Sequence, residues 1–136
     1  MAYMLGAGEK VPPQPVQQVF NTLVQAIEKG AATMRPGLPG HKIDQVVRQT
    51  VLKNSYPDYN HGTGHPVGRV AHDAGTFLGP KGRPRTALSL QMNGVYTLEP
   101  RIAIPNGGSI EEMVVVKEEG AEFISPRQTE IILIAG

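Results

Sequence analysis

The chain contains no cysteine. Disulfide bonds and thiolate metal sites are therefore excluded, and the redox compartment is not recorded in the sequence. No run of apolar residues approaches the roughly 20 that a membrane-spanning helix needs. The first residues, Met1 to Leu5, lack the basic start and the long apolar region of a secretory signal. We expect a soluble protein, with the cytoplasm as its default location.

An excess of charge of either sign is also missing. The 13 basic and 12 acidic residues are scattered along the chain and give a formal net charge of +1. This balance offers no electrostatic reason to expect nucleic acid or an anionic membrane as a partner. A length of 136 residues and a hydrophobic content of 40% suit a single domain, residues 1–136, with a modest core.

The first part of the chain has the apolar spacing of amphipathic helices. One helix is predicted from about Pro15 to Lys29, with Gly30 as its stop. A second is predicted from about His41 to Lys53, with Asn54 as a possible end. Apolar stripes at this spacing are usually core, so both helices are expected to cover one face of a sheet and to carry no chemistry.

Short strand-like runs follow the helices: Val95 to Leu98, Met113 to Lys117, Ala121 to Ile124 and Glu130 to Ile134. The turn Lys117 to Gly120 between two of them predicts a hairpin. The glycine- and proline-rich stretch Phe77 to Leu90 predicts a loop near the site. The fold class is therefore α+β, with helices first and an antiparallel or mixed sheet after them.

Three of the four histidines, His61, His65 and His72, fall in one short segment together with several glycines. Glycine lets the backbone turn tightly and approach an ion or a substrate. If the segment is partly extended, His61 and His65 lie on the same face, whereas His72 needs a bend to join them. The clustering favours a functional site over isolated structural histidines.

Two glutamates complete the pattern. Glu99 follows the strand Val95–Leu98, and Glu111 precedes an apolar run that starts at Met113. A carboxylate at the end of a buried strand is costly unless a cation compensates it. Imidazole and carboxylate together suit manganese, cobalt, iron or zinc. The sequence therefore predicts a metal site.

Other polar residues have simpler interpretations. Glu112 and the pair Glu118–Glu119 are expected on solvated faces, and His41 on the surface. Asp73 either orients a histidine or caps a turn. We assign none of them to the metal site.

These motifs, taken in order, resemble the family of methionine aminopeptidases, Xaa-Pro aminopeptidases, prolidases and creatinase, whose fold is called the pita bread. The resemblance covers nearly the whole chain and is nearest to the Xaa-Pro aminopeptidase and prolidase branch. Its motifs are Met34-Arg-Pro-Gly37, Ile43-Asp44 with Arg48, His61-Gly-Thr-Gly-His65, Val70-Ala-His72-Asp73, Thr97-Leu-Glu99-Pro100 and Ile110-Glu111-Glu112. It implies two helices packed on a curved, mostly antiparallel sheet.

The resemblance also implies roles. His65, Glu99 and Glu111 would bind metal, with Glu111 bridging two ions and Glu99 also handling the proton of the attacking water. His61 and His72 would contact the peptide substrate, and His72 and Glu99 would be catalytic. The implied reaction is hydrolysis of the N-terminal peptide bond by a metal-activated water, before proline in the prolidase-like branch.

Departures from the family pattern limit this expectation. Two upstream aspartates that complete the family's ligand set are missing, because Asp44, Asp58 and Asp73 match other positions. Pro66 and Arg101 also replace residues that are commonly glycine. We therefore expect the C-terminal part of a catalytic domain that holds at most one divalent ion and is weak or inactive alone.

Two expectations about association and function follow. A lone half of a curved sheet should expose an apolar edge, which predicts a homo-oligomer or association with a separate N-terminal half. The alternative to a metallo-aminopeptidase is a non-catalytic relative that keeps the scaffold as a binding or interaction module.

Overall fold

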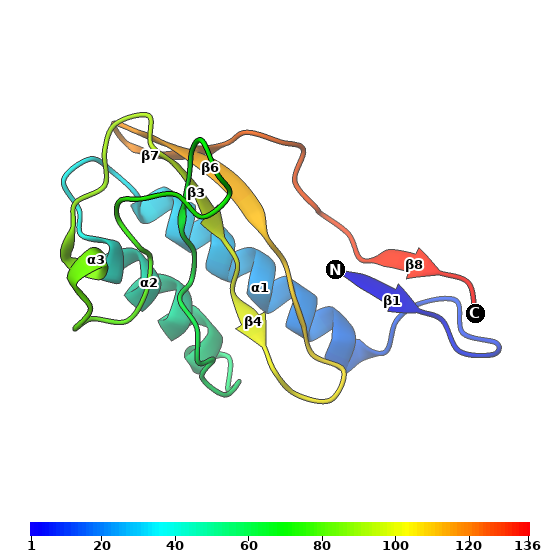
Figure 1. Ribbon diagram of the computed structural model, residues 1–136. Helices are drawn as coiled ribbons and strands as arrows, with labels where there is room; N and C mark the ends of the chain where they lie inside the picture. Colours follow the sequence, from blue (N-terminus) through cyan, green and yellow to red (C-terminus); the bar gives the residue numbers. More distant parts are fainter.

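Two helices cover one face of an antiparallel sheet in the computed structural model, which describes residues 1–136 (Figure 1). In chain order the elements are β1 (Ala2–Met4), α1 (Gln14–Thr33), α2 (Gly40–Lys53), β2 (Pro66–Val67), α3 (Pro84–Ala87), β3 (Val95–Leu98), β4 (Arg101–Ile102), β5 (Gly108–Ser109), β6 (Glu112–Lys117), β7 (Gly120–Phe123) and β8 (Ile132–Ile134). The predicted α+β class is confirmed.

Helix α1 is longer than predicted because it continues through Gly30. A Cβ at Gly30 would lie 2.6 Å from a methyl group of Val47 on α2. Gly30 is therefore the point of close approach between the two helices, and its prediction as a helix stop is wrong. The chain leaves the helix at Met34, just before Arg35 and Pro36, where the proline disfavours a helical residue ahead of it.

Helix α2 confirms its prediction to within one residue and ends at Asn54. Its apolar stripe, which includes Val47 and Val51, is fully buried, and the helix packs mainly on α1. Neither α1 nor α2 combines the length and apolar character required to cross a membrane.

The main sheet has the strand order β2-β3-β6-β7, and every neighbouring pair is antiparallel. The predicted hairpin joins β6 to β7, and its Gly120 has a φ of +113°, a conformation that favours glycine. The predicted loop Phe77 to Leu90 contains the short helix α3. Its Leu78 pairs with Gly64, so this loop does lie beside the histidine segment.

The final predicted strand does not join the main sheet. β8 pairs in parallel with β1, which the sequence pattern had not indicated, and the two form a separate ribbon near both termini (Figure 1). Large apolar side chains on this ribbon are exposed, with Met4 at 67% and Ile132 at 60%. These exposed apolar side chains lie on the ribbon and not on the edge of the main sheet, where we expected them from the sequence.

Alternation along the strands separates the core from the site. Leu98, Val114 and Val116 face the helices and are fully buried. Side chains one position away point to the opposite face of the sheet. Glu99 and Glu111 lie on that opposite face, which the helices leave open.

Glu112 corrects a sequence-based expectation. Instead of lying on a solvated face, it is 7% exposed on the helix side of the sheet. Its carboxylate accepts a hydrogen bond of 2.9 Å from the backbone N–H of Gln128. A charged residue is tolerated on this otherwise apolar face of β6 because the C-terminal segment donates a hydrogen bond to its carboxylate.

Candidate metal centre

His65 is held by the edge of β3. Its backbone N–H donates to the hydroxyl of Thr97, and the N–H of Thr97 donates to the carbonyl of His65. The ring Nδ1 lies 3.2 Å from the carbonyl oxygen of Pro66. A proton on Nδ1 satisfies that carbonyl and leaves the lone pair of Nε2 free toward the open face. The ring is buried, and its orientation is fixed before any ligand arrives.

Glu99 and Glu111 lie in a gap between two stretches of antiparallel pairing, β3 with β6 and β4 with β5, which have the same register. On one side of the gap Leu98 faces Glu112, and on the other side Arg101 faces Ser109. Continuing either register places Glu99 directly opposite Glu111. The ladder is interrupted there because Pro100 has no N–H to donate. Two carboxylates therefore face each other on the same side of the sheet.

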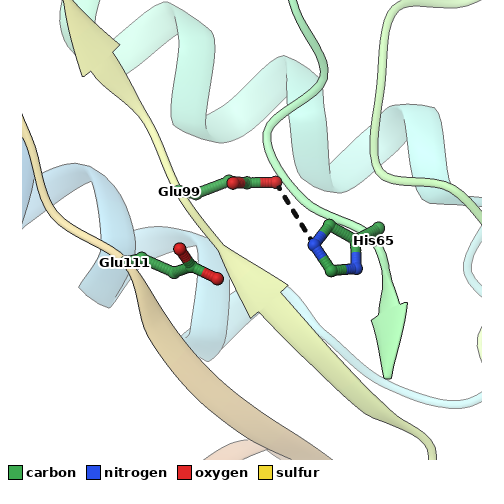
Figure 2. A group of neighbouring side chains, drawn as sticks. All are labelled: His65, Glu99 and Glu111. Carbon is green, nitrogen blue, oxygen red and sulfur yellow. Dashed lines mark ion pairs between the residues drawn. The ribbon is translucent and has the colours of Figure 1, made fainter. Parts of the chain in front are cut away.

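Figure 2 shows His65, Glu99 and Glu111 turned toward a common point. One ligand atom from each residue lies within 4.8 Å of the others. Nε2 of His65 is 3.7 Å from a carboxylate oxygen of Glu99. The three residues that the sequence nominated as metal ligands are brought together by three separate segments of chain.

The electrostatics of this group favour a cation. Burial raises the pKa of Glu99, the neighbouring charge of Glu111 raises it further, and the histidines lower it by a smaller amount. Metal-free, the two carboxylates repel each other in a partly desolvated gap. A divalent ion between them would remove that repulsion. The nitrogen and oxygen donors also suit the expected metals, so the residues present fit a divalent ion.

Replacing Glu99 by glutamine should stabilise the metal-free chain at neutral pH. Because its folded-state pKa is raised, native Glu99 holds its proton to higher pH than the unfolded chain does. Stability therefore falls as pH rises from the ordinary glutamate pKa through the raised one, and stays lower above it. Relief of a like-charge cross-strand pair is worth about 0.5 kcal/mol, or roughly 2 °C in Tm.

Thermal unfolding with a chelator present checks this expectation. E99Q should melt above the wild type at about pH 7, and the difference should shrink toward about pH 4, where the wild-type carboxyl is protonated. A wild type that melts at or above the temperature of E99Q at both pH values would show that Glu99 carries no unfavourable charge.

The group lies in an open cleft of about 510 Å³ that also includes His61, His72 and Arg101. The His72 ring is exposed and stacks on the His65 ring with centroids 3.9 Å apart. The bend that the sequence required is thus made. The His61 ring is half-buried, with Nδ1 2.7 Å from the carbonyl oxygen of Gly62. The two predicted substrate-contacting histidines and the trio share one cleft.

The neighbouring residues are placed as follows. Asp73 caps a turn, since its carboxylate accepts the backbone N–H groups of Arg69 and Ala74, and these bonds lower its pKa. It therefore orients no histidine. His41 lies at the surface as predicted, half-buried, with Nδ1 3.1 Å from the carbonyl oxygen of Thr86.

Residues that position the site were missed by sequence reasoning. Thr63 and Thr97 are buried at 0% and 2% and anchor the histidine segment. The sequence did hold a signal for both threonines. Each stands two residues before a nominated metal ligand, and in an extended chain residues two apart point to the same face. The pair Asp44 and Arg48, four residues apart on α2, also carries a sequence signal for an ion pair.

The sequence pattern of metallopeptidase family M24 matches residues 1–118. The chain belongs to this family. The fold comparison agrees: the structure resembles an X-Pro aminopeptidase of Thermotoga maritima with a TM-score of 0.80 and 28% identity, over 91% of this chain and 34% of that one. The resemblance to pita-bread metallopeptidases is thereby confirmed.

Two further comparisons point the same way. An uncharacterized peptidase of Bacillus subtilis is 29% identical over 126 residues, which cover 90% of this chain and 34% of the relative. A Xaa-Pro dipeptidase of Bacillus anthracis has a TM-score of 0.77 at 27% identity, over 91% of this chain and 34% of that one. The chain spans about a third of the length of each of these three proteins.

Proposed function

We propose that the protein is a metal-dependent aminopeptidase that hydrolyses the N-terminal bond of short peptides, with a preference for Xaa-Pro sequences. The observation that carries this proposal is the convergence of His65, Glu99 and Glu111 within 4.8 Å in an open cleft. Similarity to an X-Pro aminopeptidase and a Xaa-Pro dipeptidase supports the substrate class.

The charge of the trio suits one divalent ion. Glu99 and Glu111 supply two negative charges, neutral His65 supplies none, and the three aspartates of the chain lie outside the group. Two ions would leave two positive charges uncompensated in a partly dry cleft. Three protein ligands are a known set for a catalytic ion, which when bound supplies a Lewis acid and makes water a nucleophile near neutral pH.

The remaining chemistry falls to the side chains of the cleft. Glu99 receives the proton of the attacking water. Its raised pKa lies closer to neutral pH than that of an ordinary glutamate, which suits a general base. The exposed His72 ring, stacked on His65 in the cleft, offers its N–H to the developing oxyanion. In His61, a proton on Nδ1 would be donated to the carbonyl of Gly62, 2.7 Å away, which leaves Nε2 to accept a hydrogen bond from the substrate.

Hydrolysis of a Xaa-Pro dipeptide with added Mn²⁺ tests the proposal. We expect slow turnover that a chelator removes, because three ligands hold the ion weakly, and a lower rate on the matched Xaa-Ala dipeptide. Glu111→Ala should lower the rate to background. Equal rates for the wild type and E111A would remove the enzymatic proposal, and metal binding without turnover would favour the non-catalytic binding module.

Association is a separate proposal. The exposed apolar side chains of the β1–β8 ribbon, among them Met4 and Ile132, favour contact with a second copy or with another chain. Light scattering should detect species larger than the monomer at high protein concentration. A stable monomer under those conditions would contradict it.

A further inference from the structure

The ion pair of Asp44 and Arg48 on α2 is hydrogen-bonded to the backbone of the histidine segment. The guanidinium of Arg48 binds both carboxylate oxygens of Asp44, at 2.9 and 2.8 Å. Its remaining donors reach the carboxylate of Asp58 at 2.5 Å and two backbone carbonyls of the segment, those of Tyr59 and of His61, the latter at 2.8 Å. One planar group thus ties the helix to the loop at three points.

Asp44, the other member of the pair, extends these hydrogen bonds toward the metal centre. Asp44, which is 2% exposed, also accepts the backbone N–H and the hydroxyl of Thr63, at 3.2 and 2.9 Å. The carbonyl of Thr63 in turn accepts the backbone N–H of Glu99 at 2.7 Å. Asp44 is therefore linked to a nominated metal ligand through one residue.

Tyr59 closes the cluster on the side of the cleft. Its hydroxyl shares a 2.6 Å hydrogen bond with the Thr63 hydroxyl, and Arg48 lies 4.1 Å above its ring. The same ring contacts the His61 ring, with centroids 4.9 Å apart. The orientation of the His61 ring is thus set both by the carbonyl of Gly62 and by the Tyr59 ring, which Arg48 contacts.

We propose that Asp44 and Arg48 form a positioning pair for the proposed peptidase site. They contact neither substrate nor metal, but together they aim His61 into the cleft and fix the strand register at Glu99. This inference rests on the proposed function. It assigns a role to a helix for which we expected no chemistry from the sequence. It also explains why the Asp44 carboxylate is buried outside the cleft, although removing a charge from water is unfavourable.

Arg48→Lys is the sharpest test because it keeps the charge that Asp44 needs and removes the planar fork. A displacement of the segment should lower kcat about tenfold or more, since small misplacements of catalytic groups are expensive. In a His61→Ala background the same change should cost clearly less than in the wild type, because one of the two groups that the pair positions is gone and only the effect on Glu99 remains. Equal fold-losses in both backgrounds would overturn the proposal for His61.

A second readout does not depend on turnover. The imidazole ¹⁵N signals of His61 in the metal-free chain should move in R48K. A purely structural role would lower Tm and leave the His61 signals unchanged in the folded protein, and that result would overturn the proposal. If the wild type hydrolyses no peptide, this spectrum still decides the positioning role, and only the proposed function fails.

Arg127→Gln is the matched control. Arg127 forms an ion pair of similar length, 2.7 Å, with Glu28; this pair is more exposed than the pair on α2 and lies outside the lining of the cleft. We expect R127Q to leave kcat and the His61 signals unchanged. Should R48K fail to fold, the double variant D44N/R48Q, which removes both charges together, provides the same measurements.

Discussion

Replacing Glu111 by alanine is expected to raise the Kd for Mn²⁺ by at least about 100-fold, since outer partners of metal ligands alone are worth 10 to 100-fold. Two ligands, His65 and Glu99, would remain of the three that converge. Only one negative charge would then face a divalent ion. The pKa of Glu99 should fall, because the charge of Glu111 is one of the causes that raise it.

Calorimetric titration of the wild type and E111A measures this loss. Glu122→Ala is the matched control, because Glu122 is an exposed carboxylate on β7 of the same sheet. It should bind Mn²⁺ as the wild type does. The metal-free E111A chain should also be at least as stable as the wild type, because a like-charge pair is relieved. An unchanged Kd and stoichiometry in E111A would remove Glu111 from the site.

Replacing Gly64 by alanine is the second large effect we expect. A Cβ at this position would lie 1.9 Å from the backbone carbonyl oxygen of Thr97. Leu78 pairs with Gly64 from the opposite edge, so the segment has no free side to move toward. Either the pairing with β3 or the pairing with Leu78 must break.

The expected cost of G64A is about 3 kcal/mol of unfolding free energy, the upper part of the range for overpacking, which lowers Tm by roughly 10 °C. Because His65 follows Gly64 and is tied to Thr97, metal affinity should be lost as well. Calorimetric unfolding and metal titration measure both effects.

Gly6→Ala provides the comparison. Its added Cβ would meet only the flexible side chain of Glu9, no closer than 3.4 Å, and its backbone φ is not in the left-handed region. We expect a change within about 0.5 kcal/mol. A G64A chain with the Tm and the metal affinity of the wild type would show that the close approach to Thr97 is not needed.

The sequence predicted the elements well where one signal dominated. The apolar period of α2 located it to one residue, and β3 was predicted at its observed bounds. The helix stop at Gly30 failed because a glycine has two uses, ending a helix or admitting a close neighbour. Only the position of Val47 in space distinguishes them.

The candidate ligands could be nominated from the sequence because histidines and strand-end glutamates are chemically conspicuous. Their convergence could not be derived, since it depends on the register that places Glu99 opposite Glu111 and on the contact of β3 with the segment that carries His65. Register is a property of paired strands, and local pattern specifies it only through which face is buried.

The sequence by itself determined the α+β class, the donor types of the site and the family resemblance, because residue type and periodicity are local properties. Tertiary structure alone decided that Glu112 turns into the core while Glu111 faces the cleft, that β8 pairs with β1, and that Asp44 and Arg48 hold the histidine segment. Each of these outcomes joins residues far apart in the chain. Their partners become defined only when the sheet and helices pack.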